Sequence, residues 1–286
     1  MIPINFIAQW RQQAPWVYQS QIEQDLVLSR ALVELYQHTV IQNSLAFRGG
    51  TALNKLFVKP AARYSEDLDF VLVDDAPIGH IFSAIREALD PWLGTAKWKQ
   101  TARSAKLIYR FSSEDEPPVP LRVKIEINTV EAFNLYGYRQ HNYSVESRWF
   151  SGSSQIRTYN LEELMGTKLR ALYQRSKGRD LFDLWLSINQ LNVNCSQVLE
   201  AFQRYNAFNQ TAISRAELEK NLTFKMRTSS FNQDVGPLLA GNIPWNPETA
   251  YRSVMSALVS KLPGEPWKNL DEHSENLQPV VGEIHG

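Results

Sequence analysis

Two aspartates, Asp67 and Asp69, are separated by one residue inside an otherwise apolar stretch, Asp67-Leu68-Asp69-Phe70-Val71-Leu72-Val73. The β-branched and aromatic content predicts a buried strand. Because side chains alternate along a strand, both carboxylates should share one face, with Leu68 and Phe70 on the other. Carboxylates this close repel unless one is protonated or a cation lies between them. Mg²⁺ is bound by one or two protein carboxylates with water and substrate phosphates, so the pair predicts a magnesium site; the alternative is a solvated edge strand.

A glycine turn, Arg48-Gly49-Gly50-Thr51, precedes this strand. It lies between a short predicted strand, 45–47, and a predicted helix that ends before Pro60. Glycines let backbone amides approach a ligand, and a helix N-terminus favours negative charge, so phosphate is the expected ligand. Any tight strand-to-helix turn also uses glycine. The turn is not a Walker motif, because no Gly-Lys-Ser/Thr follows, and it lacks the third glycine of a dinucleotide fingerprint.

A third acid, Glu126, lies in the strictly alternating segment 121–128. The alternation places Glu126 on a polar face and Val123, Ile125 and Ile127 on an apolar face. If this strand pairs beside the Asp67 strand, Glu126 is available as a further metal ligand. The alternative is a solvent-exposed charge.

A basic run without any acid extends from Met165 to Arg179. Its members are Lys168, Arg170, Arg175, Lys177 and Arg179. Lys168 and Arg175 are seven residues apart and share one helix face, from which both could contact phosphate. A solvated helix face is the alternative. Asp180 and Asp183 follow directly: a helix hairpin would bring Asp183 back to Lys168, whereas Asp180 is expected to cap a helix.

Composition excludes several classes of protein. The chain has 286 residues, 30 basic and 30 acidic side chains and one cysteine, which rules out disorder, a fibre, a disulfide scaffold and a generally basic nucleic-acid coat. The lone Cys195 is read as a small buried side chain. No stretch approaches the roughly 20 apolar residues that would span a bilayer, and the N-terminus lacks a signal-peptide pattern, so a cytoplasmic protein is expected.

The predicted elements divide the chain near residue 150. Before it, helices are expected at 19–39 and 78–89 and strands at 107–111 and 121–128. Beyond it we expect mainly helices, at 161–176, 181–191 and 247–262. The first of these should open with a capping box of Asn160 and Glu163 and end at Gly178, and the last should be capped by Asn246. The prediction is a core over 1–150, a helical domain over 151–270 and a flexible tail over 271–286.

Four motifs in order resemble a known family, the AbiEii/AbiGii nucleotidyltransferase toxins of type IV toxin-antitoxin systems. They are Phe47-Arg48-Gly49-Gly50-Thr51-Ala52-Leu53-Asn54-Lys55, Arg63-Tyr64-Ser65-Glu66-Asp67-Leu68-Asp69-Phe70, Lys168-Leu169-Arg170-Ala171 and Lys177-Gly178-Arg179-Asp180-Leu181-Phe182-Asp183-Leu184. The resemblance covers roughly residues 20–190. It implies an α/β fold: a DNA polymerase β-like nucleotidyltransferase core with a mixed sheet, followed by a mainly helical C-terminal half.

The resemblance also implies roles for individual residues. Nucleotide binding falls to Gly49, Gly50, Thr51, Arg48, Lys168 and Asp180, catalysis to Asp67, Asp69, Lys168 and Asp183, and metal binding to Asp67, Asp69 and Glu126. The third acid here is Glu rather than Asp. The basic residues Arg170, Arg175, Lys177 and Arg179 would hold the acceptor in the helical domain.

The implied activity is Mg²⁺-dependent transfer of a nucleoside monophosphate from an NTP to RNA, with a tRNA acceptor end favoured, or to a protein hydroxyl. The implied partner is an antitoxin encoded upstream. Two alternatives stay open: a small-molecule nucleotidyltransferase of the antibiotic-inactivating type, and a non-catalytic nucleotide-binding module. The first would need an acidic acceptor pocket, and no acidic cluster is evident in the helical half.

Overall fold

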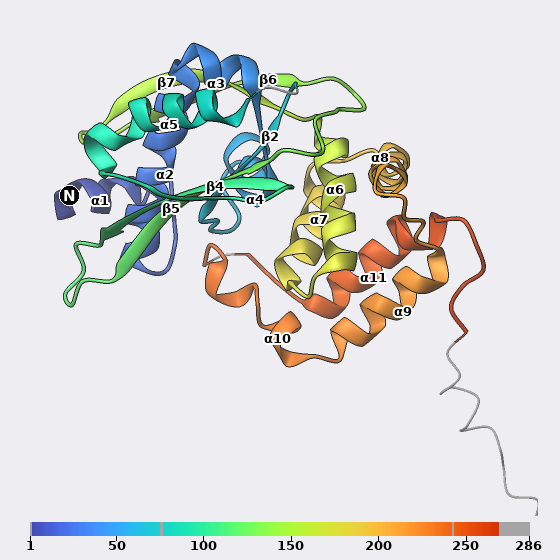
Figure 1. Ribbon diagram of the computed structural model, residues 1–286. Coiled ribbons are helices and arrows are strands. Elements are labelled where there is room, and N and C mark those ends of the chain that lie inside the picture. The colour runs from blue at the N-terminus through green and yellow to red at the C-terminus, as the bar shows by residue number, and fades with distance from the viewer. Residues whose placement is uncertain (1, 75–76, 242, 269–286) are drawn as a thin grey trace, which may run out of the picture.

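A seven-stranded mixed sheet forms one half of the computed structural model, which describes residues 2–74, 77–241 and 243–268 (Figure 1). The strand order is β3-β4-β5-β2-β1-β7-β6. The strands are β1 (Leu45–Arg48), β2 (Asp67–Leu72), β3 (Lys97–Gln100), β4 (Ser104–Ser112), β5 (Pro120–Asn128), β6 (Arg139–Glu146) and β7 (Ser151–Thr158).

The central strands set the register of the polar residues. β2 pairs antiparallel with β1 and parallel with β5, and Asp69 is the partner of both Arg48 and Glu126. Partners on neighbouring strands point to the same face of a sheet. The Asp67 and Glu126 strands therefore pair with their polar faces aligned, which was the condition for Glu126 to lie near the acidic pair.

Some helices pack beside the sheet, and others form the part of the chain that follows β7. They are α1 (Ile4–Trp10), α2 (Gln19–Gln37), α3 (Thr39–Ser44), α4 (Gly49–Ala52), α5 (Ile78–Leu93), α6 (Leu161–Gln174), α7 (Gly178–Gln190), α8 (Cys195–Phe208), α9 (Arg215–Met226), α10 (Ser229–Asn232) and α11 (Pro247–Ala257). α4 continues into a π-helical turn over Leu53–Phe57, and short 3₁₀ turns occur at Gly236–Leu238 and Val259–Lys261. No described helix is long and apolar enough to cross a bilayer.

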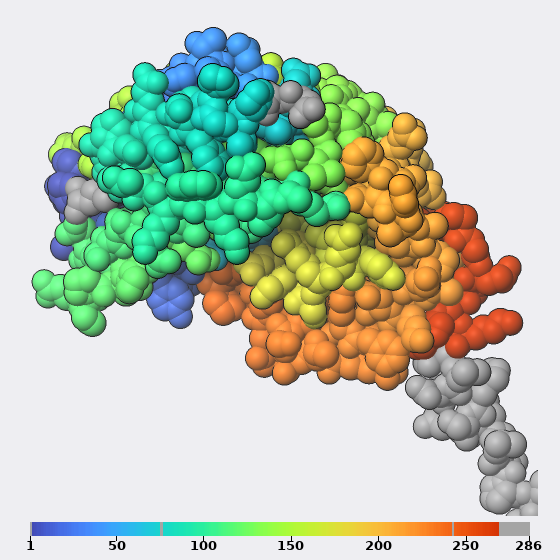
Figure 2. Space-filling view, viewed as in Figure 1, coloured from blue at the N-terminus to red at the C-terminus, as the bar shows by residue number. Residues whose placement is uncertain are grey.

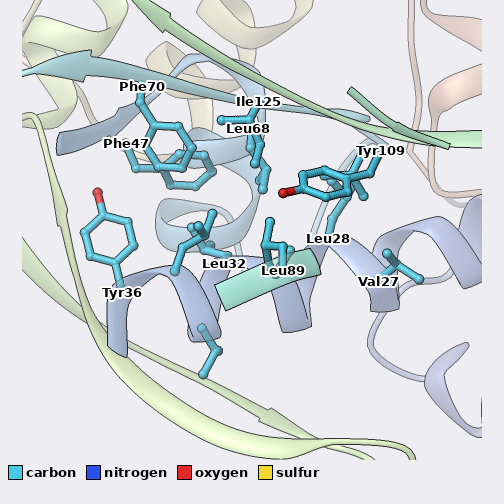
Figure 3. Packing of buried hydrophobic residues seen from close by; sticks show 14 of the residues in the cluster. Val27, Leu28, Leu32, Tyr36, Phe47, Leu68, Phe70, Leu89, Tyr109 and Ile125 are labelled. Atoms are coloured by element: carbon cyan, nitrogen blue, oxygen red, sulfur yellow. The ribbon is translucent and has the colours of Figure 1, made fainter. Parts of the chain in front are cut away.

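The main core lies between α2, α5 and one face of the sheet. Figure 3 shows Leu28 and Leu32 of α2 beneath Phe47, Leu68 and Phe70 of the central strands. All of these side chains are buried, as the alternation along β2 predicts. Their burial leaves the opposite, polar face of β2 and β5 free to line a site.

A second core joins the helices that follow the sheet. Leu169 and Leu172 of α6 pack in it with Leu181 of α7, Phe202 of α8 and Val254 of α11. In Figure 2 the green surface of the strands lies directly above the yellow surface of α6 and α7. The helical half therefore borders the sheet along α6.

The sheet extends past residue 150, where mainly helices were expected. β7 lies beyond that position and pairs parallel with β1 through Phe47 and Thr158. Its sequence is mostly polar, Ser151-Gly152-Ser153-Ser154-Gln155, so it lacks the apolar run that marks a buried strand. The change from strands to helices falls between Thr158 and Leu161. The functional division into domains stays a prediction, and the expected tail, 271–286, lies outside the described residues.

Several helix ends depart from the sequence-based expectation. Gly178 opens α7 instead of ending α6, and a side chain at this position would meet the carbonyl oxygen of Phe231. Glu163 forms no capping box; its carboxylate accepts hydrogen bonds from the amides of Leu135 and Tyr136. The Asn246 cap of α11 is confirmed by its bond from the Thr249 amide.

Candidate active site

Carboxylates from β2 lie in a cleft of about 280 Å³ between the polar face of the sheet and α6. Asp67 and Asp69 both line it, because the residues between and beyond them, Leu68 and Phe70, are buried in the core. The remaining lining side chains that carry charge are Arg48, Lys124, Glu126, Lys168 and Arg175. Acidic groups and basic groups therefore meet across one cleft.

The glycine turn reaches this cleft through Arg48 and Gly49. Gly49 has φ +80°, and a Cβ there would lie 2.6 Å from Asp69 Oδ2, so both conformation and space require glycine. Gly50 faces the other way, where a Cβ would collide with the guanidinium of Arg63. Thr51 is buried, and its hydroxyl donates to the Asp67 carbonyl oxygen at 2.5 Å. Contrary to expectation, Gly50 and Thr51 hold the turn against β2 and do not line the cleft.

The acidic pair has the electrostatics of a cation site. Burial, together with the neighbouring charge of Asp67, raises the pKa of Asp69 to about 6. The buried Oδ1 of Asp67 has no hydrogen-bond partner among the described residues. A divalent cation would relieve the repulsion and satisfy that oxygen, so the two aspartates fit Mg²⁺. No three Asp, Glu, His or Cys side chains in the described part of the chain converge into a metal-binding cluster, so water and phosphate would complete the coordination.

Glu126, the expected third metal ligand, is held by lysines instead. Its carboxylate forms ion pairs with Lys106 at 2.8 Å and Lys124 at 3.4 Å. Burial opposes its ionisation, but the hydrogen bond and charge of these lysines lower its pKa. Lys124 also contacts Asp67 Oδ2 at 2.8 Å, so its ammonium lies where a cation between Asp67 and Glu126 would be. Glu126 therefore orients Lys124 and does not directly extend the acidic pair.

The raised pKa of Asp69 should make the free energy of unfolding depend on pH. Its folded pKa, about 6, lies above the roughly 3.9 of an unfolded aspartate, so its contribution to stability is present below pH 4 and lost as pH rises through 6. Asp69→Asn should therefore raise the free energy of unfolding at pH 8 in chelator by about 1–2 kcal/mol. The gain should shrink at pH 5, as urea denaturation can measure. An equal gain at both pH values would contradict the prediction that ionised Asp69 is repelled by Asp67.

The opposite wall of the cleft is basic and comes from α6. Lys168 is nearly buried and forms ion pairs with Asp180 at 3.1 Å and Asp183 at 3.0 Å. Arg175 is more exposed and bonds to Asp180 at 2.7 Å through Nε. The predicted hairpin that returns Asp183 to Lys168 is confirmed by this contact. The two carboxylates fix the direction of the two cations that line the cleft.

Asp180 and Asp183 themselves are buried beneath the cleft. Asp180 does not cap α7; burial opposes its ionisation, but Lys168 and Arg175 lower its pKa to about 2. Asp183 accepts two hydrogen bonds of 2.7 Å from Arg63, a bidentate pair between fully buried side chains. Neither carboxylate lines the cleft; Asp180 contacts the cleft cations Lys168 and Arg175, and Asp183 contacts Lys168.

The other basic residues expected at the acceptor site are paired away from the cleft. Arg170 is buried and bonds to Glu131 at 2.6 Å. Lys177 and Arg179 both pair with Asp234. Of the four residues expected to bind the acceptor, Arg175 alone lines the cleft.

Three residues of the site were missed by sequence reasoning. Glu131 bonds to Arg48 at 3.1 Å as well as to Arg170, joining the loop after β5 to β1 and α6. Lys124 contacts the acidic pair, and Arg63 fixes Asp183. Arg63 belongs to the quoted Arg-Tyr-Ser-Glu-Asp motif, which was a usable signal; the isolated Glu131 carries none.

The chain is similar in sequence and in fold to known nucleotidyltransferase toxins. A family model described as "Nucleotidyl transferase AbiEii toxin, Type IV TA system" matches residues 30–253. The solved structure of MenT4, a nucleotidyltransferase toxin from Mycobacterium tuberculosis, is similar with a TM-score of 0.60 and 17% identity over 96% of this chain and 93% of that one.

A weaker similarity links the chain to another solved protein. This is an antigenic nucleotidyltransferase-like protein from Paracoccidioides brasiliensis, with a TM-score of 0.38 and 15% identity, over 71% of this chain and 95% of that one. No curated protein matches the sequence. The likeness to MenT4 shows a shared α/β fold.

Proposed function

Because the chain belongs to the AbiEii nucleotidyl transferase toxin family of type IV toxin-antitoxin systems, we propose that it moves a nucleoside monophosphate from an NTP onto an RNA hydroxyl and releases pyrophosphate. One observation carries this proposal: the acidic couple of β2 faces the cations of α6 across a single cleft. Carboxylates suited to Mg²⁺ and cations suited to phosphate are the two requirements of nucleotidyl transfer.

The two walls of the cleft, the polar face of the sheet and α6, have different roles in this proposal. Asp67 and Asp69 would hold Mg²⁺, which when bound neutralises phosphate charge and favours the ionised acceptor hydroxyl. Lys168 and Arg175 bind the phosphates from the opposite wall, Lys168 as a compact charge and Arg175 as a planar fork. Gly49 brings the backbone beside Asp69, where a side chain would collide with the Asp69 carboxylate. Positioning and charge neutralisation supply most of the rate.

The acceptor and the biological setting belong to the same proposal. The proposed acceptor is an RNA hydroxyl, with the end of a tRNA favoured. A protein hydroxyl is the alternative acceptor. Family membership supports an antitoxin partner, which would be encoded upstream. An NTP and RNA as substrates favour a cytoplasmic location.

A labelling experiment tests the reaction. The purified chain is incubated with each α-labelled NTP in turn, Mg²⁺, total RNA and lysate protein, and the products are separated into RNA, polypeptide and small molecules. The expected result is label in RNA that disappears when a chelator removes the metal. Label in polypeptide or in small molecules alone would overturn the choice of acceptor. Absence of label from every fraction, with all four nucleotides, would overturn the reaction.

A further inference from the structure

The polar face of the sheet continues from the cleft out to the edge strand β3 and is strongly basic. We define the basic sheet face by the six cations of β3, β4 and β5 on this side: Lys97, Lys99, Lys106, Arg110, Arg122 and Lys124. Their common side follows from register, since Lys99 is the partner of Lys106, which is in turn the partner of Glu126. Helices α2 and α5 pack on the opposite face, against Leu107, Val123 and Ile125.

Several of these charges are exposed and unpaired. Lys97, Lys99 and Arg110 are exposed and have no ion-pair partner within the described residues. Arg122 reaches Glu66 only at 3.9 Å. In the helical half, Arg170, Lys177 and Arg179 are engaged by carboxylates. Other cations of that half, among them Lys220 and Lys261, are exposed, whereas those of the sheet are aligned in register on one face that leads to the cleft.

Two like-charged pairs lie directly across neighbouring strands. Lys99 faces Lys106, and Arg110 faces Arg122. Like charges in such positions destabilise a sheet. Lysines on an edge strand also prevent aggregation, which accounts for Lys97 and Lys99. Arg110 and Arg122 lie where the β4–β5 hairpin extends past the residues that pair with β3 and β2, and they continue the row of cations that reaches Lys124.

We propose that the basic sheet face binds the phosphate backbone of the RNA acceptor and leads it to the cleft, an inference that rests on the proposed transfer to RNA. A polyanion neutralises both like-charged pairs at once and releases counterions as it binds. The face ends at Lys124, which contacts Asp67 in the cleft, so backbone held on β3 and β4 places the adjoining nucleotide beside the acidic pair. Acceptor binding thus moves from the helical domain, where the sequence suggested it, to the sheet.

A charge-reversal experiment tests the surface. The triple variant Lys97→Glu, Lys99→Glu, Arg110→Glu changes three cations outside the catalytic cleft. Its matched control, Lys220→Glu, Arg252→Glu, Lys261→Glu, changes three exposed cations of the helical half by the same charge. Binding of a fluorescent oligouridine of about 12 nucleotides is followed by anisotropy over a range of salt concentrations.

The face variant should bind the oligonucleotide at least about 100-fold more weakly at low salt, and its salt slope should fall by about 2, since each lost contact with a single strand contributes about 0.7. The control should bind like the wild type. The face variant should still fold, because its substitutions place acids opposite Lys106 and Arg122; thermal denaturation verifies this.

Other outcomes separate the surface from the reaction. If the face variant binds the oligonucleotide with wild-type affinity, or if the control loses as much affinity as the face variant, the basic sheet face is not the binding surface. The proposed function still holds in that case if the wild type labels RNA. A wild-type chain that labels only polypeptide and does not bind the oligonucleotide overturns both.

Discussion

Replacing both Asp67 and Asp69 with asparagine should reduce nucleotide transfer by at least about a thousandfold. A bound metal ion contributes several kcal/mol of charge stabilisation, and each 1.36 kcal/mol changes a rate tenfold. Asparagine keeps the shape of both side chains but removes the charge that would attract the cation. Label transfer measured at saturating Mg²⁺ and NTP gives the comparison.

The matched control for this double variant is Glu146→Gln. Glu146 is an exposed carboxylate on β6, at the far edge of the same sheet. Its replacement should leave transfer unchanged. The double variant should also lose the thermal stabilisation that Mg²⁺ gives the wild type, a readout independent of turnover. Undiminished transfer in the double variant would remove Asp67 and Asp69 from the mechanism.

Asp183→Asn should lower the free energy of unfolding by about 3–5 kcal/mol, because it leaves the buried guanidinium of Arg63 without its counter-charge. For a chain of this size the melting temperature should fall by roughly 10 °C. Transfer should fall as well, since Lys168 loses one of the two carboxylates that orient it. Urea denaturation measures the first effect and label transfer in the folded fraction the second.

A double-mutant cycle distinguishes the ion pair between Arg63 and Asp183 from the packing of the two side chains. The variant Arg63→Met, Asp183→Leu removes both charges and should be destabilised by less than the sum of the single changes. Glu248→Gln provides the comparison, because the Arg252–Glu248 pair is largely exposed and should contribute at most about 1 kcal/mol. Additive effects of the Arg63 and Asp183 substitutions would show that the two side chains do not stabilise each other.

Local patterns were sufficient to predict the acidic wall of the site. Alternation in β2 and β5 predicted which side chains face the core, and the pairing of these two strands then places Asp69 beside Glu126. The glycine turn and the hairpin of α6 and α7 were also predictable. These features depend on the period of a strand or a helix and on short loops.

Long-range ion pairing was not predictable in the same way. Whether a charged residue lines the cleft or is buried depends on a partner distant in sequence, as with Arg170 and Glu131 or Arg63 and Asp183. The basic run from Met165 to Arg179 therefore suggested an exposed surface that the fold mostly neutralises. The cations of β3 and β4 are scattered in sequence and gather only when the strands align.

Glu131 and Arg63 connect the two walls of the cleft at separate points. Glu131 bonds to Arg48 of β1 and to Arg170 of α6, and Arg63, in the loop before β2, bonds to Asp183 of α7. Opening the sheet from the helices would break both buried contacts at once. The gap between the carboxylates and the phosphate-binding cations is therefore set when the chain folds, and substrate arrival should require little hinge motion. An inhibitor of this protein would then act by binding in the cleft and blocking substrate entry, and not by separating the sheet from the helices.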